Sequence, residues 1–329
     1  MTETSVAPPK TGRMHWMDGL RGTAIVLIMV LHAAEMLRSI GMPPDEGVAM
    51  FNTIASPFRI PLLMVLSGML LGTSLSKGPG RYLVGKLRAI AWPYVVWLLL
   101  LLAVFPSLGI ETVVRGLVAP NTYLWYLHTL LIAYLAALAM RRLPAWLRTL
   151  APLALALVVS RFELPEAISM LSPQRTLVLL SFFFAGDLLM QNLPRWLPLL
   201  RHPVAILIGA ASAVAVVAIV LPPEGPGSGD AIIAPLVIAA IAAGIGLLSR
   251  APWRNPLARA LRWVGKHSIV FYVSHWITMY WGLNLFAEPL MREGPTALGA
   301  AMVAFGLVVG TAVAWLVQLR TPVRFLFRL

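Results

Sequence analysis

The chain contains no cysteine among its 329 residues, and it has few charged residues of any kind. Charged residues make up 12% of the sequence, about half of the roughly 25% found in an ordinary soluble domain. The lack of cysteine excludes disulfide bonds and thiolate chemistry. The low charge, together with a mean hydropathy of +0.82, excludes a soluble globular domain and indicates a polytopic membrane protein.

Long polar loops and strand-like alternation are also missing from the sequence. Apolar runs of roughly 17 to 25 residues recur instead, which is the length that an α-helix needs to cross a bilayer. We therefore predict an all-α membrane bundle of about ten transmembrane helices. The expected spans are 16–37, 49–75, 88–106, 121–140, 149–160, 174–190, 203–221, 231–248, 264–286 and 296–318. We expect "SPFRIP" to interrupt the second span, because Pro57 and Pro61 lack a backbone N–H.

Acidic residues are half as numerous as basic ones, 13 against 26, and the two kinds separate along the chain. Lysine and arginine gather before the first span and in the gaps after the even-numbered spans, whereas the other gaps hold most of the acidic residues. Basic loops stay in the cytoplasm, so both termini are predicted to be cytoplasmic. The net charge of +13 is then explained by topology and by attraction to anionic membrane lipids, and we expect no nucleic-acid partner.

The domain organisation expected from this pattern is simple. Residues 1–15 form a polar cytoplasmic tail, 16–319 form one transmembrane domain, and 320–329 form a basic cytoplasmic tail. The first apolar segment carries charges and lacks a small-residue cleavage site, so we expect no signal peptide. The expected location is a cell membrane, specifically a bacterial inner membrane, and no pattern indicates an oligomeric state.

Four ionisable side chains lie in the first span. On a helix at roughly 100° per residue, Asp18, Arg21, His32 and Glu35 share one face. Each Asp or Arg in a span costs at least about 2.5 kcal/mol on insertion scales, so the stripe should face protein or water. Two plainer interpretations stay open: Asp18 and Arg21 form only an i,i+3 ion pair, and His32 is only a packing residue.

The same helix resembles the opening helix of the membrane acyltransferase-3 family, whose signature is an arginine, ten residues and a histidine, here Arg21 and His32. Further resemblances follow in the family's order: "PLLMVLSGMLLG" (61–72), "KLRAIAWPYVVW" (86–97), "LWYLHTLLIAY" (124–134), "FFFAGDLL" (182–189) and "VGKHSIVFYVSHWI" (264–277). The chain departs from the family where Met64 and Val65 replace aromatic residues. It also carries Lys86 and Arg88 where the family has a run of arginines.

The resemblance implies an enzyme that moves an acyl group, commonly acetyl, from cytoplasmic acyl-CoA to a carbohydrate, glycan or lipid-linked acceptor. Acyl-CoA is then a co-substrate, and we expect no tightly bound cofactor. His32 is the candidate general base or transient acyl carrier, because an imidazole with a pKa of about 6.5 exchanges protons near neutral pH. Glu35 is expected to orient His32, and Arg21 to hold the donor's pyrophosphate or thioester region.

Candidate donor-binding residues are Lys86, Arg88 and Arg59. Lys86 and Arg88 enter the third span from the cytoplasmic side, although ordinary positive-inside residues would look the same. Arg59 lies in the expected "SPFRIP" break, where irregular backbone can line a water-filled cavity.

Candidate acceptor-binding residues are Tyr272 and His275 on one helical face, Trp125 and His128 one turn apart, and Asp18. Trp125 is also explained as an interfacial anchor, and we interpret Trp276 as part of an outer aromatic belt. Asp187 has no evident partner in the sequence.

The main alternative function is a proton-coupled transporter or flippase, since intramembrane charges also build proton relays. Transporters often contain matched broken helices in two halves, and this sequence shows no such repeat. No HExxH motif or close cluster of histidine and acidic residues occurs, so we predict no metal site.

Overall fold

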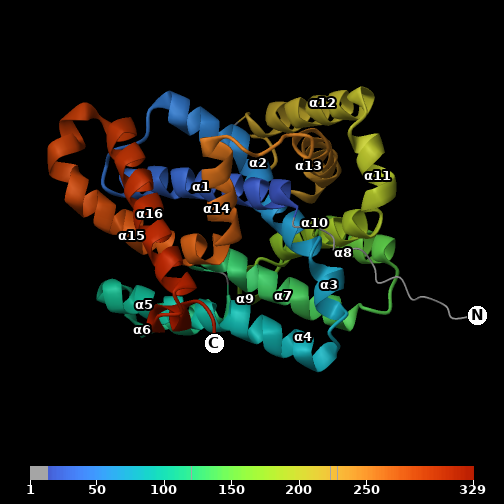
Figure 1. The fold of residues 1–329 in the computed structure, drawn as a ribbon, viewed down its shortest axis with the longest axis horizontal. Coiled ribbons are helices and arrows are strands. Elements are labelled where there is room, and N and C mark those ends of the chain that lie inside the picture. The colour runs from blue at the N-terminus through green and yellow to red at the C-terminus, as the bar shows by residue number, and fades with distance from the viewer. Residues whose placement is uncertain (1–13, 120, 223, 228) are drawn as a thin grey trace, which may run out of the picture.

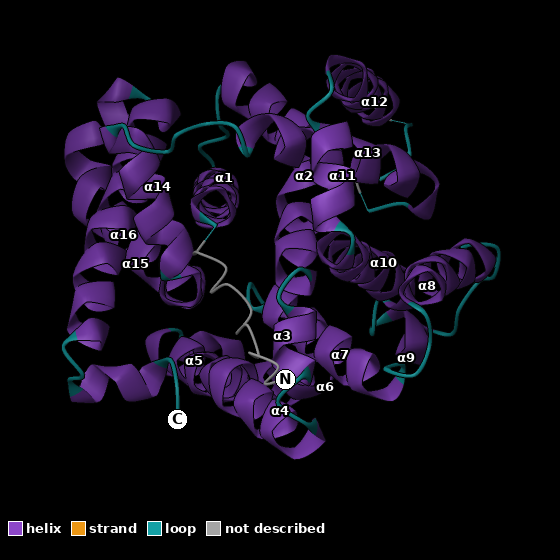
Figure 2. Ribbon diagram, turned by 45° about the vertical axis from the view of Figure 1, so that its right-hand side comes forward, coloured by secondary structure: helices purple, strands orange, loops and turns teal. Residues whose placement is uncertain are grey.

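A computed structural model of the chain describes residues 14–119, 121–222, 224–227 and 229–329. Within these residues the regular structure is helical and no strand occurs, as Figure 2 shows. Most of the predicted tail 1–15, with Lys10 and Arg13, lies outside the described residues. The predicted all-α class is confirmed.

A helix lies in each of the ten ranges predicted to span the membrane (Figure 1). These helices are α1 (His15–Ser39), α2 (Glu46–Gly68), α5 (Trp92–Val104), α7 (Trp125–Ala139), α8 (Ala145–Val159), α10 (Pro173–Gln191), α12 (Pro203–Val220), α13 (Ala234–Leu248), α15 (Ser268–Leu290) and α16 (Pro295–Gln318). Shorter helices connect them: α3 (Leu71–Leu75), α4 (Pro79–Lys86), α6 (Gly109–Val118), α9 (Glu166–Ser169), α11 (Leu193–Leu200) and α14 (Pro256–Lys266).

Seven helical segments of the described chain are long and apolar enough to cross a membrane. One of them joins α4 to α5 through a π-helical turn at Leu87–Ala91, and another joins α9 to α10. Helices α7 and α8 are apolar but shorter, with 15 residues each, and α15 has 23 residues. The chain is therefore a multi-pass helical membrane protein.

The predicted interruption of the second span at "SPFRIP" is wrong. Helix α2 continues through Pro57 and Pro61 and ends only at Gly68. A proline removes one intrahelical hydrogen bond, and membrane helices accommodate this loss because neighbouring groups satisfy the freed carbonyl. The break lies instead at Met69 and Leu70, where Leu70 N–H donates to Ser67 O at 3.2 Å and tightens the last turn.

Helix α1 occupies the middle of the bundle, with α15 and α16 on one side and α2 on the other (Figures 1 and 2). Helix α14 packs across the start of α1 at very short range. A Cβ atom added to Gly265 would lie 1.7 Å from Asp18 O, so only glycine permits this approach. The predicted ninth span therefore begins later than residue 264, because His267 separates α14 from α15.

Helices α2 and α10 meet through a second pair of glycines. A Cβ atom on Gly68 would lie 1.7 Å from Phe183 O, and one on Gly186 would lie 2.0 Å from Val65 O. Such contacts bring two helix backbones together and fix the position of α2, which faces α1 with its other side.

The C-terminal residues pack against the bundle. The indole N–H of Trp92 donates to Phe325 O at 2.5 Å, and that of Trp97 donates to Leu326 O at 3.0 Å. Phe327 is 3% exposed and contacts the Trp97 ring. Part of the predicted tail 320–329 is therefore docked on α5.

Candidate active site

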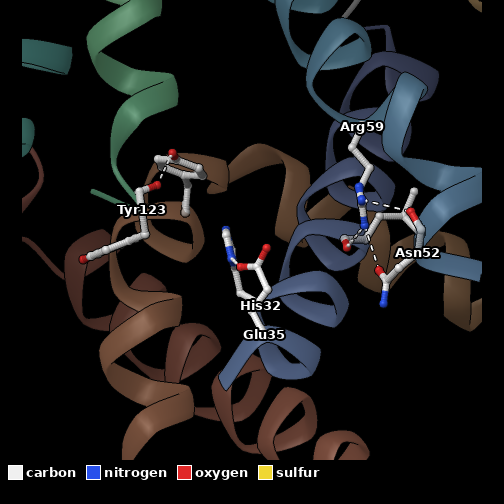
Figure 3. A network of polar contacts seen from close by, with 7 residues as sticks. His32, Glu35, Asn52, Arg59 and Tyr123 are labelled. Carbon is white, nitrogen blue, oxygen red and sulfur yellow. Dashed lines mark hydrogen bonds and ion pairs between the residues drawn. The ribbon is translucent and has the colours of Figure 1, made fainter. Parts of the chain in front are cut away.

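The site centres on His32 and Glu35, one turn apart on α1 (Figure 3). His32 Nδ1 lies 2.5 Å from Glu35 Oε2, and the exposed fractions of the two side chains are 11% and 42%. In the neutral imidazole, Nδ1–H donates to the carboxylate, and Nε2 therefore carries the free lone pair. This arrangement leaves Nε2 able to accept a proton.

His275 of α15 stacks on His32, with ring centroids 5.1 Å apart and an interplanar angle of 24°. Its Nδ1 lies 2.5 Å from Tyr272 O, and its Nε2 is buried without a hydrogen-bond partner among the described residues. The structure thus brings the predicted residues His32, Glu35, Tyr272 and His275 together.

Two aromatic residues complete the surroundings of His32. The Trp276 ring meets His32 edge-on at 5.3 Å, and Tyr123 stacks on Trp276 at 5.6 Å. The Tyr123 hydroxyl donates to Val273 O at 2.7 Å, while Tyr123 O accepts from the Tyr272 hydroxyl at 2.7 Å. Trp276 therefore packs against the site, a contact that its interpretation as an outer belt residue did not include. Tyr123 lies in the turn before α7, where the sequence shows no pattern that singles it out.

Arg21 lines a separate cavity of about 300 Å³ toward the start of α1. Its guanidinium donates to Leu66 O at 3.2 Å, and it is half-buried. Ser67 and Tyr126 line the same cavity and are joined by a 3.2 Å contact between their hydroxyls. Tyr272 also lines this cavity, so α15 connects it to the His32 cluster.

Of the three predicted donor-binding cations, Lys86 lines the Arg21 cavity. Its Nζ lies 3.6 Å from the centroid of the Tyr134 ring and 3.2 Å from Ser74 Oγ. Arg88 is two residues further along, exposed and absent from the cavity lining.

The third of these cations, Arg59, has its guanidinium engaged by protein acceptors, as Figure 3 shows. It is 3% exposed and donates to Asn52 Oδ1 at 2.8 Å, to Asn52 O at 3.1 Å and to Leu27 O at 3.4 Å. Arg59 thereby ties α2 to α1 beside the His32 pair.

The remaining predicted residues lie outside the His32 cluster. The Arg175 guanidinium covers the Trp125 ring at 4.4 Å, and His128 packs near Tyr94 with centroids 6.0 Å apart. Asp18 lines a pocket with the basic residues of α14 and is not among the residues that line the Arg21 cavity. Asp18 and Arg21 therefore line different cavities, although they share one face of α1, because α14 packs beside the first turn of α1.

Asp187 has a partner that the sequence did not identify. Arg148 of α8 reaches across to α10, with its Nη2 2.9 Å from Asp187 Oδ2. Gln191 also donates to the same oxygen at 2.9 Å. Both charged residues are buried, so this ion pair joins two helices inside the bundle.

These features define a multi-pass membrane protein with a histidine–carboxylate pair and two aromatic rings inside its helix bundle. The chain belongs to the acyltransferase-3 family, whose acyltransferase domain matches residues 14–319, nearly the whole chain. It is accordingly a membrane acyltransferase. No curated protein and no solved structure matches the chain.

Proposed function

We propose that the protein transfers an acyl group, acetyl in the simplest case, from acyl-CoA to a hydroxyl of a carbohydrate, glycan or lipid-linked acceptor. The observation that carries this proposal is the 2.5 Å contact between His32 Nδ1 and Glu35 Oε2 inside the bundle. A carboxylate that holds Nδ1–H fixes the tautomer of the imidazole and stabilises its protonated form, as in hydrolase triads. We also propose that the enzyme resides in a bacterial inner membrane.

The proposed reaction uses His32 Nε2 as a general base. Nε2 takes the proton of the acceptor hydroxyl while the oxygen attacks the thioester carbonyl and forms a tetrahedral oxyanion. The carbonyl re-forms as the carbon–sulfur bond breaks, and the coenzyme thiolate takes the proton back from the imidazolium. The products are the acylated acceptor and free coenzyme A, and positioned proton transfer of this kind typically contributes 10²–10⁴-fold in rate.

Two cations support a donor site in the Arg21 cavity. Arg21 and Lys86 both line it, and phosphate oxygens are natural partners for a guanidinium and an ammonium. Arg21 precedes His32 by 11 residues, about 16 Å along the helix axis, a span that the extended pantetheine arm would have to bridge. We infer that the coenzyme phosphates bind near Arg21 and that the thioester reaches toward His32.

The acceptor is proposed to approach from the Glu35 end of α1. The Glu35 side chain is 42% exposed whereas His32 is 11% exposed, so the pair is more open on that side. With the predicted orientation, this end of α1 faces the outside of the cell. The Trp276 ring lies next to His32, is half-buried, and has Tyr123 stacked on it, so Trp276 is the aromatic residue of the site that suits contact with a sugar ring.

The direct test measures acyl transfer from radiolabelled acetyl-CoA to envelope lipid and glycan extracts, with purified protein in proteoliposomes. Wild type is compared with His32→Ala and with His202→Asn, a matched control at the N-cap of α12, where asparagine also caps well. We expect transfer to fall at least 10²-fold in His32→Ala and to stay within twofold in His202→Asn. Undiminished transfer in a folded His32→Ala protein would remove His32 from the reaction.

The same preparation separates the acyltransferase from the transporter alternative. Acyl transfer consumes acetyl-CoA in proportion to labelled acceptor, whereas a transporter moves solute without consuming the thioester. Protein denatured rapidly at neutral pH is also examined for label on His32. A label that forms and decays within one turnover would assign His32 as an acyl carrier instead of a base.

A further inference from the structure

A cluster of basic side chains lies outside the active site, on α14. We call it the α14 pocket and define it by its lining residues Asp18, Arg259, Arg262, Trp263 and Lys266. Its volume is about 310 Å³. The acyl-transfer mechanism uses none of its basic residues.

The sequence of α14 explains why these side chains face the same way. Asn255 caps the helix by accepting from Ala258 N–H at 2.7 Å, and Pro256 occupies the first turn. Arg259, Arg262 and Lys266 follow at intervals of three and four residues, which places them on one face of the helix. The close approach of Gly265 to Asp18 O holds α14 against α1.

Arg262 is held in place by two contacts with the protein, while its Nε–H makes no hydrogen bond to any described residue. Its Nη1 donates to Trp253 O at 3.2 Å, and its Nη2 lies 2.7 Å from His15 Nδ1. Arg262 Nε and Trp263 Nε1 are buried donors that have no acceptor within the described part of the chain. Three cations against the one carboxylate of Asp18 leave the pocket positive, so its chemistry suits an anion.

The position of α14 indicates where that anion comes from. The helix connects α13 to α15 at the same end of the bundle as the start of α1, the side that the loop charges predict to be cytoplasmic. Leu257 on α14 is 70% exposed, and Trp263 borders the pocket. A helix with a basic face, an exposed leucine and a tryptophan suits the headgroup layer of a membrane.

We propose that the α14 pocket binds the phosphate of an anionic phospholipid headgroup. Arg259 and Lys266 contact the phosphate from the exposed face of α14. The half-buried guanidinium of Arg262 adds positive charge at the base of the pocket. Basic pockets at the cytoplasmic ends of membrane helices are suited to anionic headgroups, and each cation contributes about 1 kcal/mol near such a surface. The bound lipid neutralises the basic face of α14 and thereby stabilises the helix that packs against the start of α1.

The test follows the thermal unfolding of the full-length protein in nanodiscs made of phosphatidylcholine alone or of a three-to-one mixture with phosphatidylglycerol. Dissociation constants come from titrating short-chain phosphatidylglycerol into detergent-solubilised protein. The variant Arg259→Gln/Lys266→Gln keeps Arg262 and its structural contacts. The matched control Arg141→Gln/Arg142→Gln removes the same charge from another loop on the same predicted side.

We expect phosphatidylglycerol to raise the unfolding temperature of wild type and of the control. In Arg259→Gln/Lys266→Gln the affinity falls about 30-fold, equivalent to about 2 kcal/mol at 1.4 kcal/mol per tenfold. An unchanged affinity in this variant overturns the proposal, and so does an equal response to phosphatidylcholine.

Two competitors distinguish other sources of phosphate. Displacement of phosphatidylglycerol by coenzyme A would assign the pocket to the coenzyme, and displacement by inorganic phosphate at equal concentration would show that no lipid is recognised. Either result overturns the lipid assignment. Because lipid affinity is measured without acyl transfer, failure here is separate from failure of the proposed reaction.

Discussion

His32 of α1 and His275 of α15 stack with their ring centroids 5.1 Å apart, although they are 243 residues apart in the sequence. His275 is in turn held by the contact of its Nδ1 with Tyr272 O at 2.5 Å. The imidazole of His32 is therefore restrained from two directions, by Glu35 through a hydrogen bond and by His275 through ring stacking. These two restraints are separable by mutation.

Replacement of His275 tests the stacking restraint. In His275→Ala the stack is lost, and since an aromatic pair contributes roughly 0.5–1.5 kcal/mol, we expect kcat to fall up to about tenfold. His275→Phe restores the ring, so kcat should return to within a factor of about two while the KM for acyl-CoA stays constant. Equal losses in the two variants would mean that a nitrogen of His275 takes part in the reaction.

Replacement of Glu35 tests the hydrogen-bond restraint. Glu35→Gln keeps an acceptor for Nδ1–H but removes the negative charge that stabilises the imidazolium, so we expect kcat to fall about 10²-fold. The KM for acyl-CoA should not change, because Glu35 is not among the residues that line the Arg21 cavity. A fall in affinity for the donor with an unchanged kcat would contradict the assigned role.

The residues Lys86 and Arg88 allow a matched test of the donor site. Lys86 lines the Arg21 cavity, whereas Arg88 is exposed outside it. Lys86→Met should raise the KM for acyl-CoA about tenfold, the effect of losing about 1.4 kcal/mol from a charged contact with phosphate. Arg88→Met should leave this KM unchanged. An equal rise of this KM in both variants would mean that the positive charge of the surface attracts acyl-CoA and that Lys86 makes no specific contact with it.

The positions of the main apolar helices could be predicted from the sequence, because the length of an apolar run is a local property. About ten helices are predicted to cross the membrane, and seven helical segments of the described chain are long and apolar enough to do so. The pairing of His32 with Glu35 was equally accessible, since a spacing of three residues on a helix places side chains together. The stack of His32 on His275 was not, because it depends on how α1 and α15 pack. No single-sequence pattern reports that packing.

The error at the prolines of α2 and the contacts that the sequence did not show have physical causes of the same kind. Prolines in α2 were expected to break a helix that its neighbours instead hold together. The contact of Trp276 with His32 was missed because a tryptophan at a membrane interface and a tryptophan in a site near it look alike in sequence. Asp18 was assigned to the stripe of Arg21, and only the packing of α14 reveals that the two side chains line different cavities.

The close glycine contacts between α2 and α10 predict that two glycine-to-alanine substitutions have very different effects on the unfolding temperature. Gly68→Ala puts a methyl group 1.7 Å from Phe183 O, so the two helices must separate, and we expect a drop of several degrees in the unfolding temperature. Gly244→Ala, within α13, has nothing within 4 Å of the new methyl group and should be neutral or slightly stabilising. Similar thermal stability in the two variants would contradict the close contact between α2 and α10.

The ion pair between Arg148 and Asp187 predicts that replacing one partner lowers the unfolding temperature more than replacing both. Both side chains are buried, so removing either one leaves an uncompensated charge, which typically costs about 3–5 kcal/mol. Arg148→Met and Asp187→Leu should each lower the unfolding temperature strongly in detergent. The double variant replaces the pair by apolar side chains and should recover much of the loss, because the desolvation of both charges disappears. Gln191 then loses its acceptor on Asp187, so the recovery stays incomplete. Additive losses in the double variant would show that Arg148 and Asp187 act independently, in contradiction to the 2.9 Å contact between them.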